Sequence, residues 1–186
     1  MFSILVPSIV MLPSYQSALR RGWSPDTLTD QSAVELQASA TDPAGFIAKK
    51  SDAANADVAG RDISLPDGTS VPRLPMRDRW IWDGEFCGRI GLRYRPGTND
   101  LPPQTLGHVG YAVVPWKRQR GLATRALAAI LGEARAVGLT RVSLTCDSDN
   151  IASQKVIFGC GGRLAERFVA ANYGGSEKLR YTIDLL

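Results

Sequence analysis

The sequence predicts a mixed α/β domain in which helices flank a central, mostly antiparallel sheet of about six to seven strands. Two alternating apolar runs meet at Asp83-Gly84, a dipeptide that strongly favours a tight hairpin between antiparallel strands. A long segment after Gly121 repeats its apolar residues at three- and four-residue spacing, as a helix packed on a core does. Strand-like and helix-like segments alternate around these two features. Their order indicates a single domain over residues 1–186.

The first 70 residues give the weakest pattern. The apolar run MFSILVPSIVML (1–12) is not a membrane span, because Pro7 interrupts it and it is shorter than the roughly 18 residues that a span needs. It predicts a first strand instead. PSYQSALRRGWSP (13–25) predicts a short helix with Ser14 as its cap and Gly22 at its end. Residues 26–60 predict one further helix around AVELQA, and the stretch SDAANADVAGRD (51–62) is predicted to be flexible.

The rest of the chain is easier to interpret. After the hairpin strands of residues 71–95, the predicted elements are a loop at 96–104, a strand at 106–114 stopped by Pro115, a helix at 122–137 ended by Gly138, a strand at 141–146, a short helix at 150–158, and strands at 163–170 and 178–186. The last strand could pair with the same strand of a second copy, which would make the protein a homodimer.

The segment VVPWKRQRGLATRAL (113–127) joins the end of a strand to the long helix. A glycine-containing turn before a helix presents unpaired backbone N–H groups and the positive end of the helix dipole, which together favour an anion. Gly121 lets the backbone approach that anion closely, and Lys117, Arg118 and Arg120 add positive charge. The segment therefore predicts a diphosphate site. It is not a Walker loop or a dinucleotide fingerprint, because the Gly-Lys-Ser/Thr end and the three-glycine spacing are absent.

The spacing Arg118-x-x-Gly121-x-Ala123 resembles the acetyl-CoA pyrophosphate loop of the GNAT superfamily of N-acetyltransferases, written Gln/Arg-x-x-Gly-x-Gly/Ala. Downstream, DNIASQKVIFGCGG (149–162) resembles the second signature of that superfamily, in which an Asn is followed by a Ser and a helix ending in glycine. The resemblance covers residues 107–162 and implies that they form an acetyl-CoA-binding core. Residues 1–70 would then form the variable acceptor side.

The resemblance also implies a set of residues that contact acetyl-CoA, the cosubstrate, without a metal. The backbone amides of Val113 and Val114 would stabilise the oxyanion, Asn150 would bind the pantetheine arm, and Lys155 would meet the 3′-phosphate. The implied contacts are Val113, Val114, Arg118, Gln119, Arg120, Gly121, Leu122, Ala123, Thr124, Asn150, Ser153 and Lys155.

Transfer of an acetyl group to an amine needs a way to deprotonate the amine and a proton donor for the leaving thiolate. His108 is the only histidine, and its reference pKa of about 6.5 makes it the candidate base. A histidine bonded to the backbone at a strand end is the alternative. Ser153 is the candidate partner of the thiol, because Ile157 stands where many members carry a tyrosine. Tyr111, Tyr173 and Tyr181 are further candidates for the acid.

The leading hypothesis is an N-acetyltransferase that acts on a primary amine of a small molecule or a protein N terminus in a ternary complex. A non-catalytic module that binds CoA or acyl-CoA is the alternative, suggested by Ile157. A nucleic-acid binder is disfavoured, because the net charge is only +4 and the basic patch lacks interleaved aromatic residues. Cys87, Cys146 and Cys160 lack metal-ligand spacing, which favours free thiols and a cytoplasmic protein without membrane contact. The acceptor is not predicted.

Overall fold

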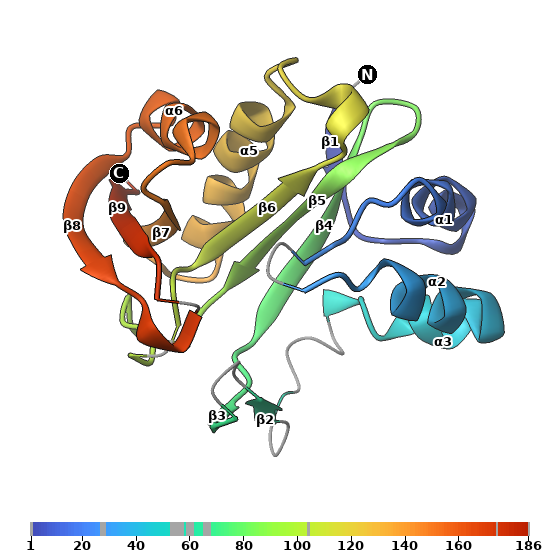
Figure 1. The fold of residues 1–186 in the computed structure, drawn as a ribbon, viewed down its shortest axis with the longest axis horizontal. Helices are drawn as coiled ribbons and strands as arrows, with labels where there is room; N and C mark the ends of the chain where they lie inside the picture. The colour runs from blue at the N-terminus through green and yellow to red at the C-terminus, as the bar shows by residue number, and fades with distance from the viewer. Residues whose placement is uncertain are drawn as a thin grey trace.

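The strands of the core form two sheets that lie side by side (Figure 1). The computed structural model describes residues 2–26, 29–52, 58, 62–64, 68–103, 105–173 and 175–185. Within this part of the chain, one sheet has the order β1-β4-β5-β6 and the other β7-β9-β8, and every strand pair is antiparallel. These strands are β1 (Ser3–Leu5), β4 (Met76–Trp82), β5 (Phe86–Arg93), β6 (Val109–Val113), β7 (Arg141–Asp147), β8 (Arg163–Val169) and β9 (Glu177–Asp184). The predicted mixed, mostly antiparallel architecture is present, but its sheet is divided between β6 and β7.

The N-terminal region differs from the sequence prediction in four places. The first strand is only β1, and residues Ile9–Met11 form a 3-10 helix that leads into α1 (Leu12–Arg20). Ser14 does not cap α1, because its hydroxyl accepts the N–H of Phe86 at 2.8 Å.

Two helices follow where one was predicted: α2 (Ser32–Thr41) and α3 (Pro43–Ala48). The side chain of Asp42 caps α3, which explains why a second helix begins there. A two-stranded ribbon of β2 (Asp62–Ser64) and β3 (Ser70–Pro72) was not predicted. Most of the predicted flexible stretch at 51–62 lies outside the described residues.

The remaining elements agree with the sequence prediction. The hairpin turns at Gly84, whose φ of +120° favours glycine. The helices are α5 (Leu122–Ala136) and α6 (Ile151–Gly159), with 3-10 turns at Pro115–Lys117 and Ala171–Tyr173. Within the described residues, no helix is long and apolar enough to cross a membrane.

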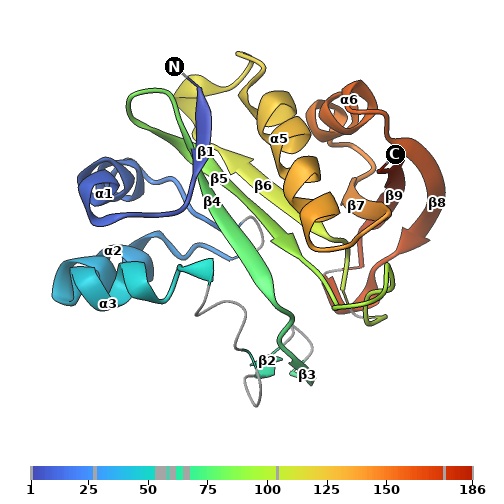
Figure 2. The ribbon, with the colours of Figure 1, turned by 180° about the vertical axis from the view of Figure 1, so that it is seen from behind.

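Helices cover the two faces of the β1-β4-β5-β6 sheet separately (Figures 1 and 2). On one face α5 packs against β5, β6 and α6, and the core there includes Leu127, Ile130 and Leu144. On the other face α1 and α3 pack around Tyr15, Trp80 and Phe86. Because residues alternate in β5, Ile90 and Leu92 face α5, while Arg89 and Arg93 face the other way.

Candidate active site

The turn before α5 leaves a row of backbone N–H groups without protein partners. Among the described residues of this turn, the backbone N–H groups of Lys117, Arg118 and Arg125 donate hydrogen bonds to backbone carbonyls. The N–H groups of residues 119–124, which lie between them, donate no backbone hydrogen bond. Gly121 has a φ of +69° and Gln119 a φ of +61°, so the chain turns twice through the left-handed region. Six successive amides at the positive end of a long helix favour a bound anion.

The basic side chains of this turn divide into two groups. Arg118 and Arg120 are exposed, and the Nε of Arg118 donates to the carbonyl of Val113 at 3.2 Å. Lys117, in contrast, is buried and bonds Asp83 at 2.6 Å and Glu85 at 2.8 Å. The expectation that Lys117 adds charge to the anion site was therefore wrong. Its ion pairs instead fasten the turn to the β4–β5 hairpin.

Strands β6 and β7 touch only at one end, and the two sheets separate beyond it. The N–H of His108 donates to the Ser143 carbonyl at 2.7 Å, and the Thr145 hydroxyl donates to the Leu106 carbonyl. A Cβ at Gly107 would lie 2.9 Å from the Ser143 carbonyl oxygen, so only glycine allows this close contact. From there to their C-terminal ends the two strands are not paired with each other.

The separation leaves the outer edge of β6 available. The N–H of Val114 donates to the Cys87 carbonyl at 2.9 Å, so alternate residues of β6 bond β5. The N–H of Val113 and Tyr111 consequently point toward the gap. The Val114 amide is already used and is not free for an oxyanion, contrary to the sequence expectation, whereas the Val113 amide has the right direction.

The first turn of α6 lies across this gap from β6. Asn150 caps the helix, since its Oδ1 accepts the N–H of Ser153 at 3.0 Å. The Tyr111 hydroxyl reaches the Ser153 carbonyl at 3.5 Å, and burial raises the pKa of Tyr111 to about 12. Lys155 is exposed, and Ile157 is buried in the core. The structure thus brings Tyr111, Asn150 and Ser153 together at one place.

A cavity of about 560 Å³ opens from this gap over the face of β5 and β6 that α5 does not cover. Its floor includes Gly91, Gly110 and Ala112, and its wall includes Tyr111 and Cys146. The α1–α2 connection contributes Pro25, Asp26 and Thr29, so the N-terminal region does line this space. A small acceptor could therefore enter from the side opposite α5.

Charged side chains line the cavity, and most of them are paired. Arg89 bonds Asp78 at 3.2 Å, and Lys178 is bonded by Asp147. The Lys178 ammonium, together with Ser176, holds the pKa of Asp147 below its ordinary value. The Arg93 side chain also lines the cavity, and within the described residues it makes no hydrogen bond or ion pair. Sequence analysis missed both arginines, although Arg89-Ile90-Gly91-Leu92-Arg93 alternates polar and apolar residues and so indicates a charged strand face.

His108 lies at the sheet junction and not in this cavity. Its Nδ1 accepts the N–H of Ser143 at 2.9 Å, so the proton of the neutral ring is on Nε2, which has no hydrogen-bond partner among the described residues. Burial, assisted by the charge of Arg93, lowers the pKa of His108 to about 4. It lines a separate cavity of about 190 Å³ with Asn99 and Thr105. The nitrogen of His108 that could accept a proton is already occupied by the Ser143 N–H, which argues against His108 as the general base.

The other sequence candidates are distributed as follows. Tyr173 lines the large cavity, but Tyr181 is buried in the core beside α5. The three cysteines are free, as predicted. Burial raises the pKa of the Cys146 thiol, so it is a poor nucleophile although it lines the cavity. In the described residues, no group of His, Cys, Asp or Glu is arranged to hold a metal ion.

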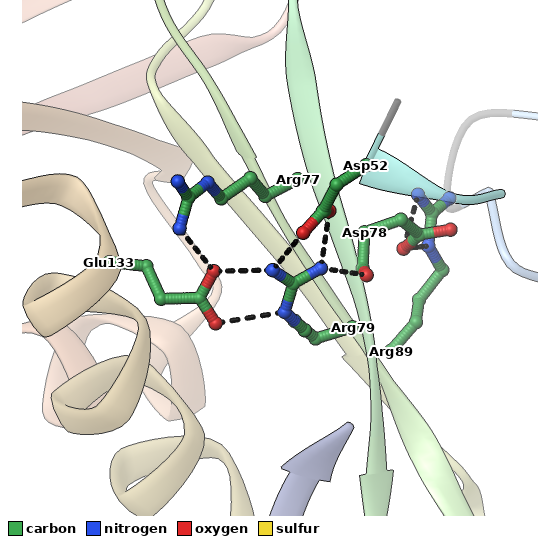
Figure 3. A network of polar contacts seen from close by, with 6 residues as sticks. All are labelled: Asp52, Arg77, Asp78, Arg79, Arg89 and Glu133. Atoms are coloured by element: carbon green, nitrogen blue, oxygen red, sulfur yellow. Dashed lines mark hydrogen bonds and ion pairs between the residues drawn. The ribbon is translucent and has the colours of Figure 1, made fainter. Parts of the chain in front are cut away.

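A polar network on the other face of β4 joins the acceptor side to α5 (Figure 3). Arg79 is buried, and its guanidinium bonds both oxygens of Asp52 at 2.7 Å and Glu133 at 2.6 and 2.8 Å. Arg77 adds a contact to Glu133 at 3.1 Å. Asp52 follows α3, and Glu133 belongs to α5, so the side chain of Arg79 connects the segment after α3 to α5.

Residues 18–163 match the family model described as Acetyltransferase (GNAT) domain. Among solved structures, the chain is similar to Mycobacterium smegmatis RimJ in complex with a CoA disulfide, at 19% identity and a TM-score of 0.66, over 98% of this chain and 81% of that one. It is also similar to RimL, a ribosomal L7/L12 alpha-N-protein acetyltransferase in complex with coenzyme A, at 13% identity and a TM-score of 0.60, over 99% and 94%.

A third similar structure is the microcin C7 self-immunity acetyltransferase MccE in complex with acetyl-CoA and AMP, at 14% identity and a TM-score of 0.57, over 98% and 92%. No curated protein sequence matches the chain. The GNAT-like fold predicted from the two motifs is confirmed by the family match and by these structural similarities.

Proposed function

Because the chain belongs to the GNAT family of acetyltransferases, we propose that it transfers the acetyl group of acetyl-CoA directly to a primary amine of a small molecule within a ternary complex. The observation that carries this proposal is the place where the free amides before α5, the open edge of β6 and the mouth of the large cavity come together. All three of these similar structures contain CoA, a CoA disulfide or acetyl-CoA, which supports the same cosubstrate here.

The residues present fit that cosubstrate. The amides of Gln119, Arg120, Gly121, Leu122, Ala123 and Thr124 would hold the pyrophosphate, with the side chain of Arg118 beside them. The Val113 amide would bind the pantetheine arm or the thioester carbonyl, since it faces the gap between the sheets. Asn150 keeps its Nδ2 for the same arm while its Oδ1 caps α6, and exposed Lys155 would meet the 3′-phosphate.

The leaving thiolate needs a proton, and we assign the role of proton donor to Tyr111. Its hydroxyl is protonated at neutral pH because burial raises its pKa to about 12, and it lies at the first turn of α6. Ser153 would hold the sulfur next to it. Ile157 cannot donate, because it is an apolar core residue.

The acceptor amine must lose a proton before it attacks. An alkylamine has a reference pKa of about 10.4, so converting it to its neutral form at pH 7 costs roughly 4 to 5 kcal/mol of free energy. Of the sequence candidates and cavity acids with a described partner, Asp147 is paired with Lys178, and His108 lies outside the cavity. The positive charge of Arg93, which has no ion-pair partner in the described residues, would instead lower the pKa of a bound amine, and water would take the proton.

The direct route is favoured over an acetyl-cysteine intermediate. Cys146 is the cysteine that lines the cavity, and its raised pKa keeps it protonated. Initial rates measured against both substrates should therefore give intersecting double-reciprocal lines. Parallel lines, together with loss of activity in Cys146→Ala, would contradict direct attack.

Thiol release is the experiment that tests the function. Purified protein and acetyl-CoA are mixed with a panel of amines, and released CoA is followed with a thiol reagent, alongside a CoA binding titration. Release above the rate without acceptor supports acetyl transfer. Binding of CoA with no release for any amine would favour a regulatory CoA-binding module, and no CoA binding would overturn the site.

A further inference from the structure

The cavity floor is formed by a pair of glycines with an arginine above each. Gly91 of β5 lies opposite Gly110 of β6. A Cβ built on Gly91 would lie 3.7 Å from Nη2 of Arg89, and one built on Gly110 would lie 3.6 Å from Nη2 of Arg93. The missing side chains therefore leave room for both guanidinium groups over the sheet, where both arginines line the cavity.

The two arginines differ in how their charge is balanced. Figure 3 shows Arg89 paired with Asp78, at 3.2 Å, while the separate Arg79 has its own two carboxylates. On the same face of the sheets, Lys178 is paired with Asp147 and Arg180 with Glu166. In the described parts of the chain, Arg93 has no such partner.

The environment of Arg93 makes this charge costly in the free protein. Burial and the nearby charge of Arg89 lower the pKa of Arg93, and Tyr173 and Asp26 only partly offset them. The Asp26 carboxylate lines the cavity and accepts the N–H of Thr29 at 3.1 Å. An anion bound beside Arg93 would relieve both unfavourable effects.

We propose that Arg93 binds the carboxylate of the acceptor, so that the substrate is a small molecule with both a primary amine and a carboxylate, as in an amino acid. The inference rests on the acetyl transfer proposed above. The guanidinium of Arg93 offers paired donors to a carboxylate, and Arg89 flanks it. The amine would then extend toward Tyr111 and Cys146, where the sheets separate.

The charge of the site favours a carboxylate over a phosphate. Arg93 supplies a positive charge without an ion-pair partner in the described residues, and the Asp26 carboxylate of the same cavity disfavours a phosphate monoester, which approaches two negative charges. The positive charge of Arg93 also favours the reactive form of an amino acid, whose neutral amine and ionised carboxylate sum to one negative charge. Binding and deprotonation of the acceptor are thus favoured by the same side chain.

The test compares acceptors that differ only in the carboxylate. A panel of amino acids that differ in their side chains is assayed, each beside its own amino acid amide. In the same way, β-alanine is assayed beside phosphoethanolamine. We expect kcat/KM for the amino acids to exceed that for the amides by about 100-fold. Equal values, or a preference for phosphoethanolamine over β-alanine, would overturn the assignment.

Variants connect this preference to Arg93. Arg93→Met should reduce the ratio of acid to amide to within about threefold, while Arg93→Lys, which keeps the charge but loses the paired donors, should give an intermediate ratio. Arg95→Met is the matched control. It removes an exposed arginine that lies two residues after Arg93, beyond the end of β5, and it should leave the ratio unchanged. An unchanged ratio in Arg93→Met would refute the role of Arg93.

A binding measurement separates this inference from the proposed function. N-acetyl amino acids and their amides, the expected products, are titrated by calorimetry into the protein with CoA present. Tighter binding of the acids, lost in Arg93→Met, supports the carboxylate site even if no acceptor in the panel is acetylated. Equal affinity of acids and amides, or no binding of either, overturns the carboxylate site whether or not other amines release thiol.

Discussion

The turn before α5 and the cavity over β5 and β6 are the two halves of the proposed site, but they are built differently. The turn uses the backbone amides of consecutive residues 119–124, whereas the cavity uses side chains from the α1–α2 connection, β5, β6, β7 and β9. A site made from consecutive amides leaves a local pattern of glycine and basic residues. A site assembled from distant side chains has no such pattern, which explains why only the first half was predicted in detail.

Buried polar side chains connect the elements around the proposed site at two points. Arg79 connects Asp52, which follows α3, to Glu133 of α5, and His108 connects the start of β6 to Ser143 of β7. Both contacts join segments that are far apart in the sequence. Substitutions at these points, and then within each half, separate the two contributions.

Replacing Arg79 should have the largest effect, because it breaks the connection between α5 and the segment after α3. Arg79→Met leaves Asp52 and Glu133 without their shared partner, and we expect the free energy of unfolding to fall by about 3 to 5 kcal/mol. Arg77→Met is the control, since Arg77 is more exposed and should cost less than about 1 kcal/mol. Denaturant unfolding measures both. Equal losses of unfolding free energy in the two variants would mean that Arg79 contributes no more to stability than Arg77 does.

His108→Asn tests the junction of the sheets through pH. The pKa of His108 is lowered from 6.5 to about 4, so the folded protein holds a neutral ring while the unfolded chain takes up a proton below pH 6.5. Stability should therefore fall as the pH drops from about 6.5 to about 4, by up to about 3 kcal/mol from this residue. Asn keeps an acceptor for the Ser143 N–H but cannot titrate.

The difference in unfolding free energy between the wild type and His108→Asn should thus change across this pH window. The pH dependence of kcat/KM between pH 6 and 9 should remain the same in both. A rate profile that loses a group titrating near pH 6.5 in His108→Asn would restore His108 as the general base.

Tyr111→Phe tests the point where the halves meet. Loss of the hydroxyl should lower kcat by about 10- to 100-fold, because the thiolate loses its proton donor, with little change in the Kd of CoA. Tyr173→Phe removes a hydroxyl from another part of the same cavity and should change kcat less than threefold. A larger loss in Tyr173→Phe would transfer the proposed role to that residue.

Gly121→Ala tests the backbone half alone and should have the smallest effect. Its φ of +69° makes a Cβ unfavourable by about 1 kcal/mol, and we expect the Kd of CoA to rise about five- to tenfold. Gly138→Ala, at the other end of α5, has a φ of +88° and similar open space, so it carries the same strain without touching CoA. Weaker CoA binding in both variants would show that strain, and not the loop, is responsible.

Several parts of the molecule follow from local sequence. The Asp83-Gly84 hairpin, the helix after Gly121 and the helix after Asn150 form where their patterns predict, because turn chemistry, apolar spacing and capping act over neighbouring residues. The cap of α3 at Asp42 has the same local character and was missed, since two adjacent helices were interpreted as one.

Other features depend on residues that are far apart in the chain. Lys117 looked like part of the anion site, but its partners Asp83 and Glu85 lie on a hairpin that only the folded sheet brings near. The same holds for His108, whose partner Ser143 fixes its tautomer and whose burial removes it from proton transfer at neutral pH.

The sequence by itself determined the family, the order of the elements and the amides that would hold a diphosphate, because each depends on residues close together in the chain. Only the tertiary structure decided which amide of β6 points into the gap, which cavity arginine has no ion-pair partner among the described residues, and where the only histidine lies. Pairing between strands, burial and ion pairing arise from contacts across long sequence separations, and these contacts give the acceptor side its chemistry.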